Sequence, residues 1–265
     1  MTIKSPPEVK SSDHWKTPFS LLLAHFVCGA ITTIIVQSFN DFENSSEALA
    51  FYGVYHRYAW NQVIHFFGVP GILWSLAIFM AHVRLPGSIP VGWAQGIVPA
   101  ILLPIKMEIQ LNYANILFMT YFLFYVTIDP LGGILYAPVL FATYVAAIKL
   151  YELDQVVAVV DAGKDGHAPW YGTGKMLKFA ALVHFLSWFL QIQIGHNMIE
   201  GAQPASMQNL GAALSVAPLF AFYEGLWLVG INRELQEKTA LLVHQYTAEI
   251  CGAGNIAMEA CRHYV

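Results

Sequence analysis

The sequence predicts an all-α protein, a multi-spanning transmembrane helical bundle. Hydrophobic residue types make up 57% of the 265 residues and charged types only 11%, whereas about 25% of residues are charged in an ordinary soluble domain. The charged residues gather in a few segments, and apolar stretches of helix length lie between those segments. Charge that is both scarce and segregated is typical of chains that cross a membrane several times.

The first apolar stretch, residues 19–36, has about the length that a helix needs to cross a bilayer, roughly 20 residues. It is followed by Gln37 and acidic residues rather than by a small-residue cleavage site, which favours a retained span over a signal peptide. The sequence therefore predicts an N-terminal extension, residues 1–46, with a candidate extra span. A serine at position 45 or 46 before Glu47 predicts the start of a short helix.

The middle of the chain predicts a series of membrane helices. Five apolar segments have the required length, namely residues 61–83, 109–128, 131–150, 176–199 and 210–231. The second and third of them meet at Asp129-Pro130, a turn so short that they must form a helical hairpin. Residues 91–105 carry two prolines and predict a bent or only partly inserted helix.

Charge and turn-forming residues define the remaining segments. Residues 161–175 are rich in glycine and charge and predict a loop, in which His167 is expected to be solvated. Residues 232–265 regain charge and predict a polar C-terminal tail that starts with an exposed helix. The sequence thus predicts a membrane domain over residues 47–231.

Charge and cysteine content exclude two classes of protein. The net charge is -4 and there is no basic block, so nucleic acid is not expected as a partner. The three cysteines, at positions 28, 251 and 261, match no zinc motif and predict no disulfide framework.

Four histidines at the edges of apolar segments or inside them are the candidate functional residues: His56, His65, His184 and His196. A buried imidazole needs a partner, and a metal ion is the partner that would gather several of them. Residues four apart share a helix face, so Asn61 should accompany His65 and Glu200 should accompany His196. Gln191 lies on the same predicted stripe as His184.

Neutral imidazoles with one carboxylate suit iron(II), zinc, copper or manganese, and two histidines with one carboxylate are typical of non-haem iron oxygenases. Glu200 is the candidate carboxylate ligand. Glu224 is expected to hold a ligating histidine from behind or to form an inter-helix hydrogen bond. The alternative is a lipid transporter or membrane scaffold whose histidines are structural or relay protons. His25 and His82 are expected to make helix contacts only.

A longer set of motifs resembles the membrane 2-hydroxy fatty acid dioxygenase family over about residues 47–231. The motifs are Phe51-Tyr52-Gly53-Val54-Tyr55-His56, Asn61, His65, Val69-Pro70, Asp129-Pro130, His184 to Gln191 with Trp188, Gly195-His196, Glu200, Pro204-Ala205, Asn209-Leu210, Ala217-Pro218 and Glu224.

This resemblance implies an integral membrane enzyme of the endoplasmic reticulum that uses Fe2+ and dioxygen in fatty acid α-oxidation. The implied substrates are 2-hydroxy fatty acids from phytosphingosine breakdown, each shortened by one carbon. The family's essential histidines fall on His56, His65, His184 and His196, with Asn61, Gln191, Glu200 and Glu224 as candidate catalytic residues. The apolar segment at 19–36 and the insert at 161–174 leave open a paralogous metalloenzyme acting on another lipid or terpenoid. A homo-oligomer also stays an open option.

Overall fold

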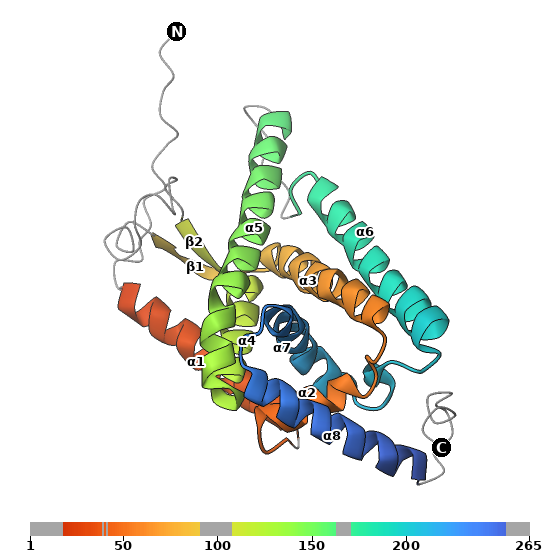
Figure 1. The fold of residues 1–265 in the computed structure, drawn as a ribbon. Helices are drawn as coiled ribbons and strands as arrows, with labels where there is room; N and C mark the ends of the chain where they lie inside the picture. The colour runs from red at the N-terminus through yellow and green to blue at the C-terminus, as the bar shows by residue number, and fades with distance from the viewer. Residues whose placement is uncertain (1–17, 39, 41, 91–107, 163–170, 253–265) are drawn as a thin grey trace.

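A computed structural model describes residues 18–38, 40, 42–90, 108–162 and 171–252. Within these residues the protein is a bundle of helices with a single two-stranded antiparallel ribbon at one side (Figure 1). The predicted all-α class is confirmed. Residues 91–105, the predicted bent helix, lie outside the described residues, as does His167.

The elements follow one another in this order: α1 Pro18–Gln37, α2 Ser45–Gly53, α3 Ala59–Ala81, β1 Arg84–Pro90, β2 Glu108–Asn112, α4 Tyr113–Ile128, α5 Pro130–Ala162, α6 Lys175–Phe189, the π-helix η2 Leu190–Glu200, the short 3-10 helix η3 Ala205–Met207, α7 Leu210–Leu228 and α8 Arg233–Gly252.

Four helical segments are long and apolar enough to cross a membrane: Ala59–Ala81, Pro130–Asp161, Lys175–Glu200 and Leu210–Leu228. They correspond to four of the five predicted spans. The fifth, at residues 109–128, starts later than predicted, because Asn112 and Asn115 form a capping box that begins α4 at Tyr113. Helix α1 runs over Pro18–Gln37, 20 residues, and so includes the apolar stretch 19–36 in which the sequence predicted an extra span.

Two other local predictions need correction. The short helix α2 does start at Ser45, but its cap is Asn44, whose side-chain oxygen accepts from the backbone N–H of Glu47 at 3.1 Å. The helix predicted to end at residue 150 continues to Ala162, because Asp154 is buried instead of marking an exit to water. His82 lies beside this carboxylate, with 3.8 Å between its Nε2 and Asp154 Oδ2.

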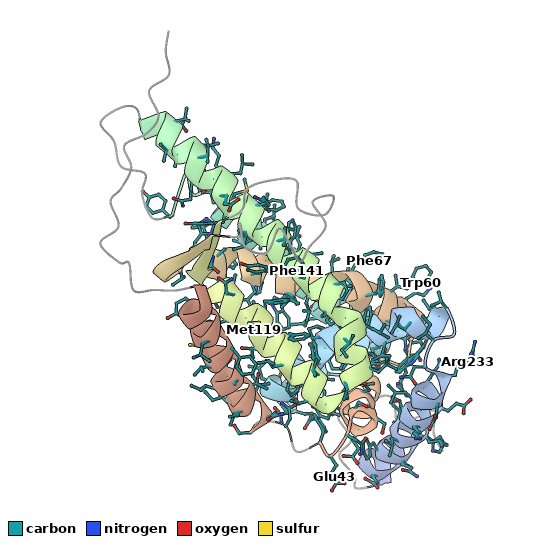
Figure 2. All side chains as sticks on the ribbon, turned by 90° about the vertical axis from the view of Figure 1, so that its left-hand side faces the viewer. Glu43, Trp60, Phe67, Met119, Phe141 and Arg233 are labelled. Atoms are coloured by element: carbon teal, nitrogen blue, oxygen red, sulfur yellow. The ribbon has the colours of Figure 1, made fainter. Side chains whose placement is uncertain are left out.

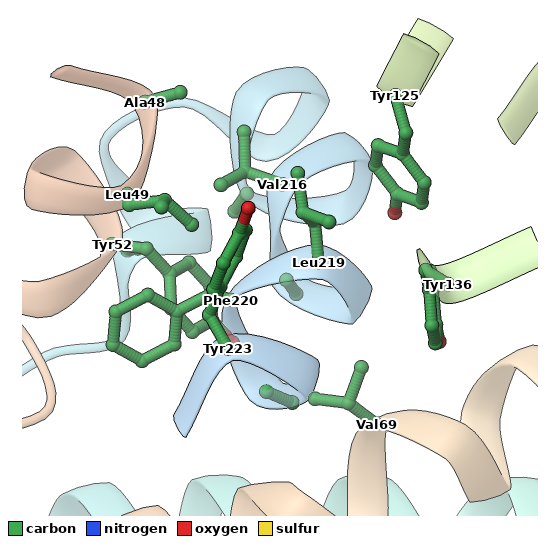
Figure 3. Close-up of a cluster of buried hydrophobic side chains, with 14 of the residues drawn as sticks. Ala48, Leu49, Tyr52, Val69, Tyr125, Tyr136, Val216, Leu219, Phe220 and Tyr223 are labelled. Atoms are coloured by element: carbon green, nitrogen blue, oxygen red, sulfur yellow. The ribbon is translucent and has the colours of Figure 1, made fainter. Parts of the chain in front are cut away.

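The centre of the bundle is α3, which contacts α4, α5, α6, α7 and η2. The main core forms around α7, whose Val216 and Phe220 pack toward Leu49 and Tyr52 of α2, while Leu219 lies between them and Tyr125 of α4 (Figure 3). The helical hairpin at Asp129 is fastened to this core, since the hydroxyl of Tyr223 donates to the Asp129 carboxylate. Between membrane helices such contacts stabilise the bundle through close van der Waals packing and inter-helix hydrogen bonds.

The outer surface is apolar. Side chains such as Phe67, Phe185, Leu228 and Val160 are each at least 65% exposed. Figure 2 shows side chains projecting away from the bundle around Phe67, Trp60 and Phe141. A water-soluble protein does not usually expose apolar side chains over so many helices. Lipid is the environment that suits this surface.

Candidate metal centre

Three histidines from separate elements meet inside the bundle. One ligand atom from each of His56, His65 and His196 lies within 4.8 Å of the others. The ring centroids are 4.3 Å apart for His56 and His65 and 4.9 Å for each pair with His196, and the rings are inclined by 74° to 79° to one another. All three residues are only 2% exposed. Rings that are crossed in this way aim nitrogens at a shared point instead of stacking.

The connection between α2 and α3 positions His56. Its Nδ1 donates to the carbonyl of Tyr52 at 2.8 Å, and its ring stacks on the Tyr52 ring with centroids 4.1 Å apart. Because a carbonyl can only accept, Nδ1 carries the proton and Nε2 keeps its lone pair. That Nε2 is buried and has no hydrogen-bond partner within the described part of the chain.

Helix α3 positions His65 in the same manner. Its Nδ1 donates to the carbonyl of Asn61, one turn earlier, at 2.9 Å. This bond fixes the tautomer and leaves Nε2 free for a ligand, which is the arrangement that backbone carbonyls commonly give to metal-binding histidines.

The π-helix η2 positions His196. Its buried residues are Gln191, Gly195, His196 and Glu200, which recur every four to five residues, as suits a helix wider than an α-helix. Gly195 lets η2 approach α3, because a Cβ at this position would press on the Asn61 amide and lie 3.3 Å from Cε1 of His65. The Nδ1 of His196 is buried and has no partner among the described residues.

Glu200 joins the end of η2 to the start of α3. Its carboxylate accepts from the backbone N–H of Arg57 at 3.0 Å, the backbone N–H of Tyr58 at 3.2 Å, the Asn61 amide at 3.1 Å and Nε of Arg57 at 3.3 Å. Four donors compensate the burial of this charge. The structure therefore places Glu200 behind the histidines, as a positioning group for both helices.

The other predicted site residues lie outside the three-histidine cluster. His184, on α6, has both ring nitrogens occupied, by the Ser75 hydroxyl at 2.9 Å and the Trp188 indole N–H at 3.0 Å. Glu224, on α7, contacts neither the histidines nor Glu200 through a hydrogen bond, and both of its oxygens lack partners in the described residues. The assignment of His184 as a fourth ligand stays a prediction.

A cavity of about 100 Å³ opens from the histidines and runs along α3. His65, His196, Gln191 and Tyr52 lie on its wall, and the rest of the lining is mostly apolar, from α3, α4, η2 and α7. The side-chain amide of Gln191 donates a hydrogen bond to the Ser187 carbonyl at 2.9 Å. The cavity therefore joins a nitrogen-lined end to an apolar channel.

Burial lowers the pKa of His56 well below its ordinary value of 6.5, and the neighbouring His65 and His196 lower it further. Burial also raises the pKa of the Tyr52 phenol, which keeps it neutral. A neutral imidazole is the form that binds a metal ion. The cluster is thus held in its ligating protonation state.

Sequence reasoning missed two supports of this site, Tyr52 and Gly195. The signals were present, since Tyr52 lies four residues before His56 and Gly195 directly before His196. Their roles depend on stacking and on close helix approach, which spacing alone does not reveal.

The fold and the site define a helical protein with several helices of membrane-spanning length and a buried three-histidine cluster that could hold a metal ion. Residues 42–226 match the family described as 2-hydroxy-palmitic acid dioxygenase Mpo1-like. The chain belongs to this family, as its motifs predicted. Comparisons with curated proteins and with solved structures gave no match.

Proposed function

We propose that the protein is an integral membrane, iron(II)-dependent dioxygenase that shortens 2-hydroxy fatty acids by one carbon. The observation that carries the proposal is the three-histidine cluster, in a chain whose family is named for a 2-hydroxy-palmitic acid dioxygenase. The endoplasmic reticulum is the proposed location, and it follows from the family resemblance alone.

The donor set fits ferrous iron. His56 and His65 each have Nδ1 committed to a carbonyl, so Nε2 is available, and imidazole suits iron among the first-row metals. Three protein ligands would leave open positions for substrate and dioxygen, as non-haem iron oxygenases require. When bound, the ion would supply the redox chemistry that lets dioxygen react with an organic substrate.

The reaction balances without a further co-reactant. A 2-hydroxy acid, R-CH(OH)-COOH, and O₂ give R-COOH, CO₂ and H₂O. The bond between the carboxyl carbon and C2 breaks, C2 is oxidised to the new carboxyl group, and dioxygen is reduced by the four electrons that the substrate provides. The sequence contains no nucleotide-binding glycine motif, in agreement with this balance.

Different residues of the cavity would contact different parts of the substrate. The apolar wall that includes Ile72, Leu76 and Leu214 would contact the methylenes next to the polar end of the substrate, because a cavity of about 100 Å³ is too small for a whole long acyl chain. The polar end of the substrate would lie at the histidines, near Gln191 and near Asn61 Oδ1, a buried acceptor without a partner in the described residues. Tyr52, neutral and stacked on His56, would exclude water from that side.

The site also lies where a charged carboxylate could reach it. His56 precedes the span Ala59–Ala81, His65 is six residues inside it, and His196 is four residues from the end of the span Lys175–Glu200. Six residues of helix rise only about 9 Å, compared with a hydrocarbon core of about 30 Å. The proposed centre is therefore near one membrane surface.

The test is metal analysis of purified protein in mild detergent, joined to an aerobic turnover assay with 2-hydroxypalmitate. We expect about one iron per chain and the formation of pentadecanoate and carbon dioxide with oxygen uptake. His65→Ala and His196→Ala should lose both iron and turnover. Protein that carries no iron, with both variants folded and fully functional, would favour a transporter or scaffold and refute the proposal.

A further inference from the structure

A second cavity, of about 440 Å³, lies between α3, α7 and the start of α8. It shares no lining residue with the cavity at the histidines. Most of its wall is apolar and includes Phe66 and Phe67 of α3 and Trp227 of α7, and its polar groups come from Gln62, Glu224 and Gln236. Nothing in the proposed dioxygenase reaction uses this space.

Glu224 is the unusual member of this wall. Both of its carboxylate oxygens are buried and accept no hydrogen bond from the described residues. The indole N–H of Trp227, three residues later, is also buried and donates to none of them. Lys238 of α8 is paired with Glu234 at 2.8 Å, and Arg57 is paired with Glu200. Burial of a carboxyl group without a partner costs several kcal/mol of free energy. A bound ligand that donates hydrogen bonds to Glu224 would offset this cost.

The surroundings define the chemistry of that partner. Two unpaired acceptor oxygens require a donor, and a carboxylate in an apolar wall favours a positive charge. A primary ammonium group supplies three N–H donors and one charge, and the faces of Phe66, Phe67 and Trp227 would attract the same cation. A fatty acid carboxylate brings no N–H donor and a second negative charge, so it suits this wall less well.

The cavity is also reached from the apolar outside of the bundle. Phe67 is 71% exposed and Leu228 87%, and Figure 2 shows Phe67 beside Trp60 at the corner of the molecule that carries Arg233. An occupant with an aliphatic chain could leave that chain on the apolar surface while its polar end entered toward Glu224.

We propose that this second cavity binds the protonated primary amine of a single-chain amphiphile, with the Glu224 carboxylate accepting hydrogen bonds from the ammonium group. The aromatic wall encloses the methylenes next to the amine. The site is separate from the histidine cavity and takes a ligand of opposite charge to the proposed substrate.

The test is saturable binding of tritiated hexadecylamine to the full-length protein in maltoside micelles near neutral pH. We expect binding at about one site per chain, displaced by unlabelled hexadecylamine. Glu224→Gln should weaken it about 10-fold or more, the scale of losing a charge-assisted contact in a buried site. Glu234→Gln removes an exposed carboxylate from α8 and should leave binding unchanged.

A second pair of variants keeps the test independent of the folding of Glu224→Gln. Val63→Trp fills the cavity while Glu224 stays, and we expect it to abolish saturable binding. Leu182→Trp places the same side chain on an exposed position of α6, outside the cavity, and should bind as wild type.

Three outcomes would overturn the inference: wild-type binding by Glu224→Gln or by Val63→Trp, displacement by hexadecanol as effective as by hexadecylamine, or equal displacement by hexadecyltrimethylammonium. Displacement by hexadecanol would indicate a cavity that binds only the apolar chain. Displacement by hexadecyltrimethylammonium would indicate a site that binds a cation without hydrogen bonds. The assay needs neither iron nor oxygen, so a failure of the dioxygenase proposal would leave its result unaffected.

Discussion

At the scale of single residues, the site depends on how each polar group is occupied. Glu200 was the carboxylate expected to bind metal, yet its oxygens accept from two backbone N–H groups, the Asn61 amide and Arg57. Two of the three clustered imidazoles, His56 and His65, have Nδ1 bound to a carbonyl and Nε2 available for a metal ion. Positioning groups differ from candidate metal ligands in that their polar atoms already have hydrogen-bond partners. The spacing of residues in the sequence does not show this difference.

Glu200→Ala should destabilise the protein by about 3–5 kcal/mol, the usual cost of removing one partner from a buried ion pair, because Arg57 and two backbone N–H groups would lose their acceptor. Thermal unfolding of the detergent-solubilised, metal-free protein would measure this. The matched control is Glu152→Ala, whose pair with Lys149 is about one-third exposed and should matter by less than about 1 kcal/mol. Unchanged stability with lost metal binding would instead make Glu200 a ligand.

The histidines should separate into two groups when metal binding is titrated. We expect His65→Ala to lose stoichiometric iron binding, because it removes one of the three clustered nitrogens. His184→Ala should keep the stoichiometry and cost about 1 kcal/mol of stability, typical of an inter-helix hydrogen bond in a membrane, since His184 links α6 to Ser75 of α3. Loss of the metal from His184→Ala, with the fold intact, would restore it as a fourth ligand.

At the scale of the elements, the sequence predicted four of the membrane-length helices from the length of its apolar segments, and the hairpin at Asp129-Pro130 from the short turn. It missed the ribbon of β1 and β2, because short strands beside long apolar segments leave no periodic signal of their own. It also treated residues 190–200 as α-helix. The widened turn of η2 brings Gln191, His196 and Glu200 onto one buried face, and η2 packs against α3, a tertiary contact that apolar length does not reveal.

The close approach of η2 to α3 should not tolerate a methyl group at Gly195. Gly195→Ala would press on Asn61 and lie 3.3 Å from the His65 ring, so we expect a loss of about 1–3 kcal/mol from overpacking and markedly weaker metal binding. Gly225→Ala is the control, because it meets mainly the ring of Phe66, which is 41% exposed and can turn. Metal affinity and unfolding midpoints measured side by side would reveal the difference, and equal behaviour of the two variants would contradict this account.

At the scale of the whole molecule, composition was enough to predict a membrane bundle, and the order of the motifs was enough to predict the family. The convergence of His56, His65 and His196 was predicted as well. The isolation of His184 was not, because twelve residues of helix separate it from His196 and sequence cannot say how far the intervening turns carry a side chain. The domain boundaries at residues 46 and 231 stay predictions.

Metal binding should stabilise the entire bundle, because the three ligands come from the α2–α3 connection, α3 and η2. We expect Fe2+ under anaerobic conditions at about 100 times its dissociation constant to add about 2.7 kcal/mol of stability. The gain should disappear on acidification, since protons compete for the same nitrogens. Unfolding scans of wild type and His196→Ala would test this, and an equal gain in both proteins would place the metal elsewhere.

The widened turn of η2 has a consequence for the metal site. Around an ordinary α-helix, at about 100° per residue, Gln191 and His196 would lie about 140° apart because they are five residues apart. They could not then share the buried face that they share in η2. A substitution that turned η2 into an α-helix of the same length would leave the hydropathy profile of the chain almost unchanged and would still separate His196 from His56 and His65.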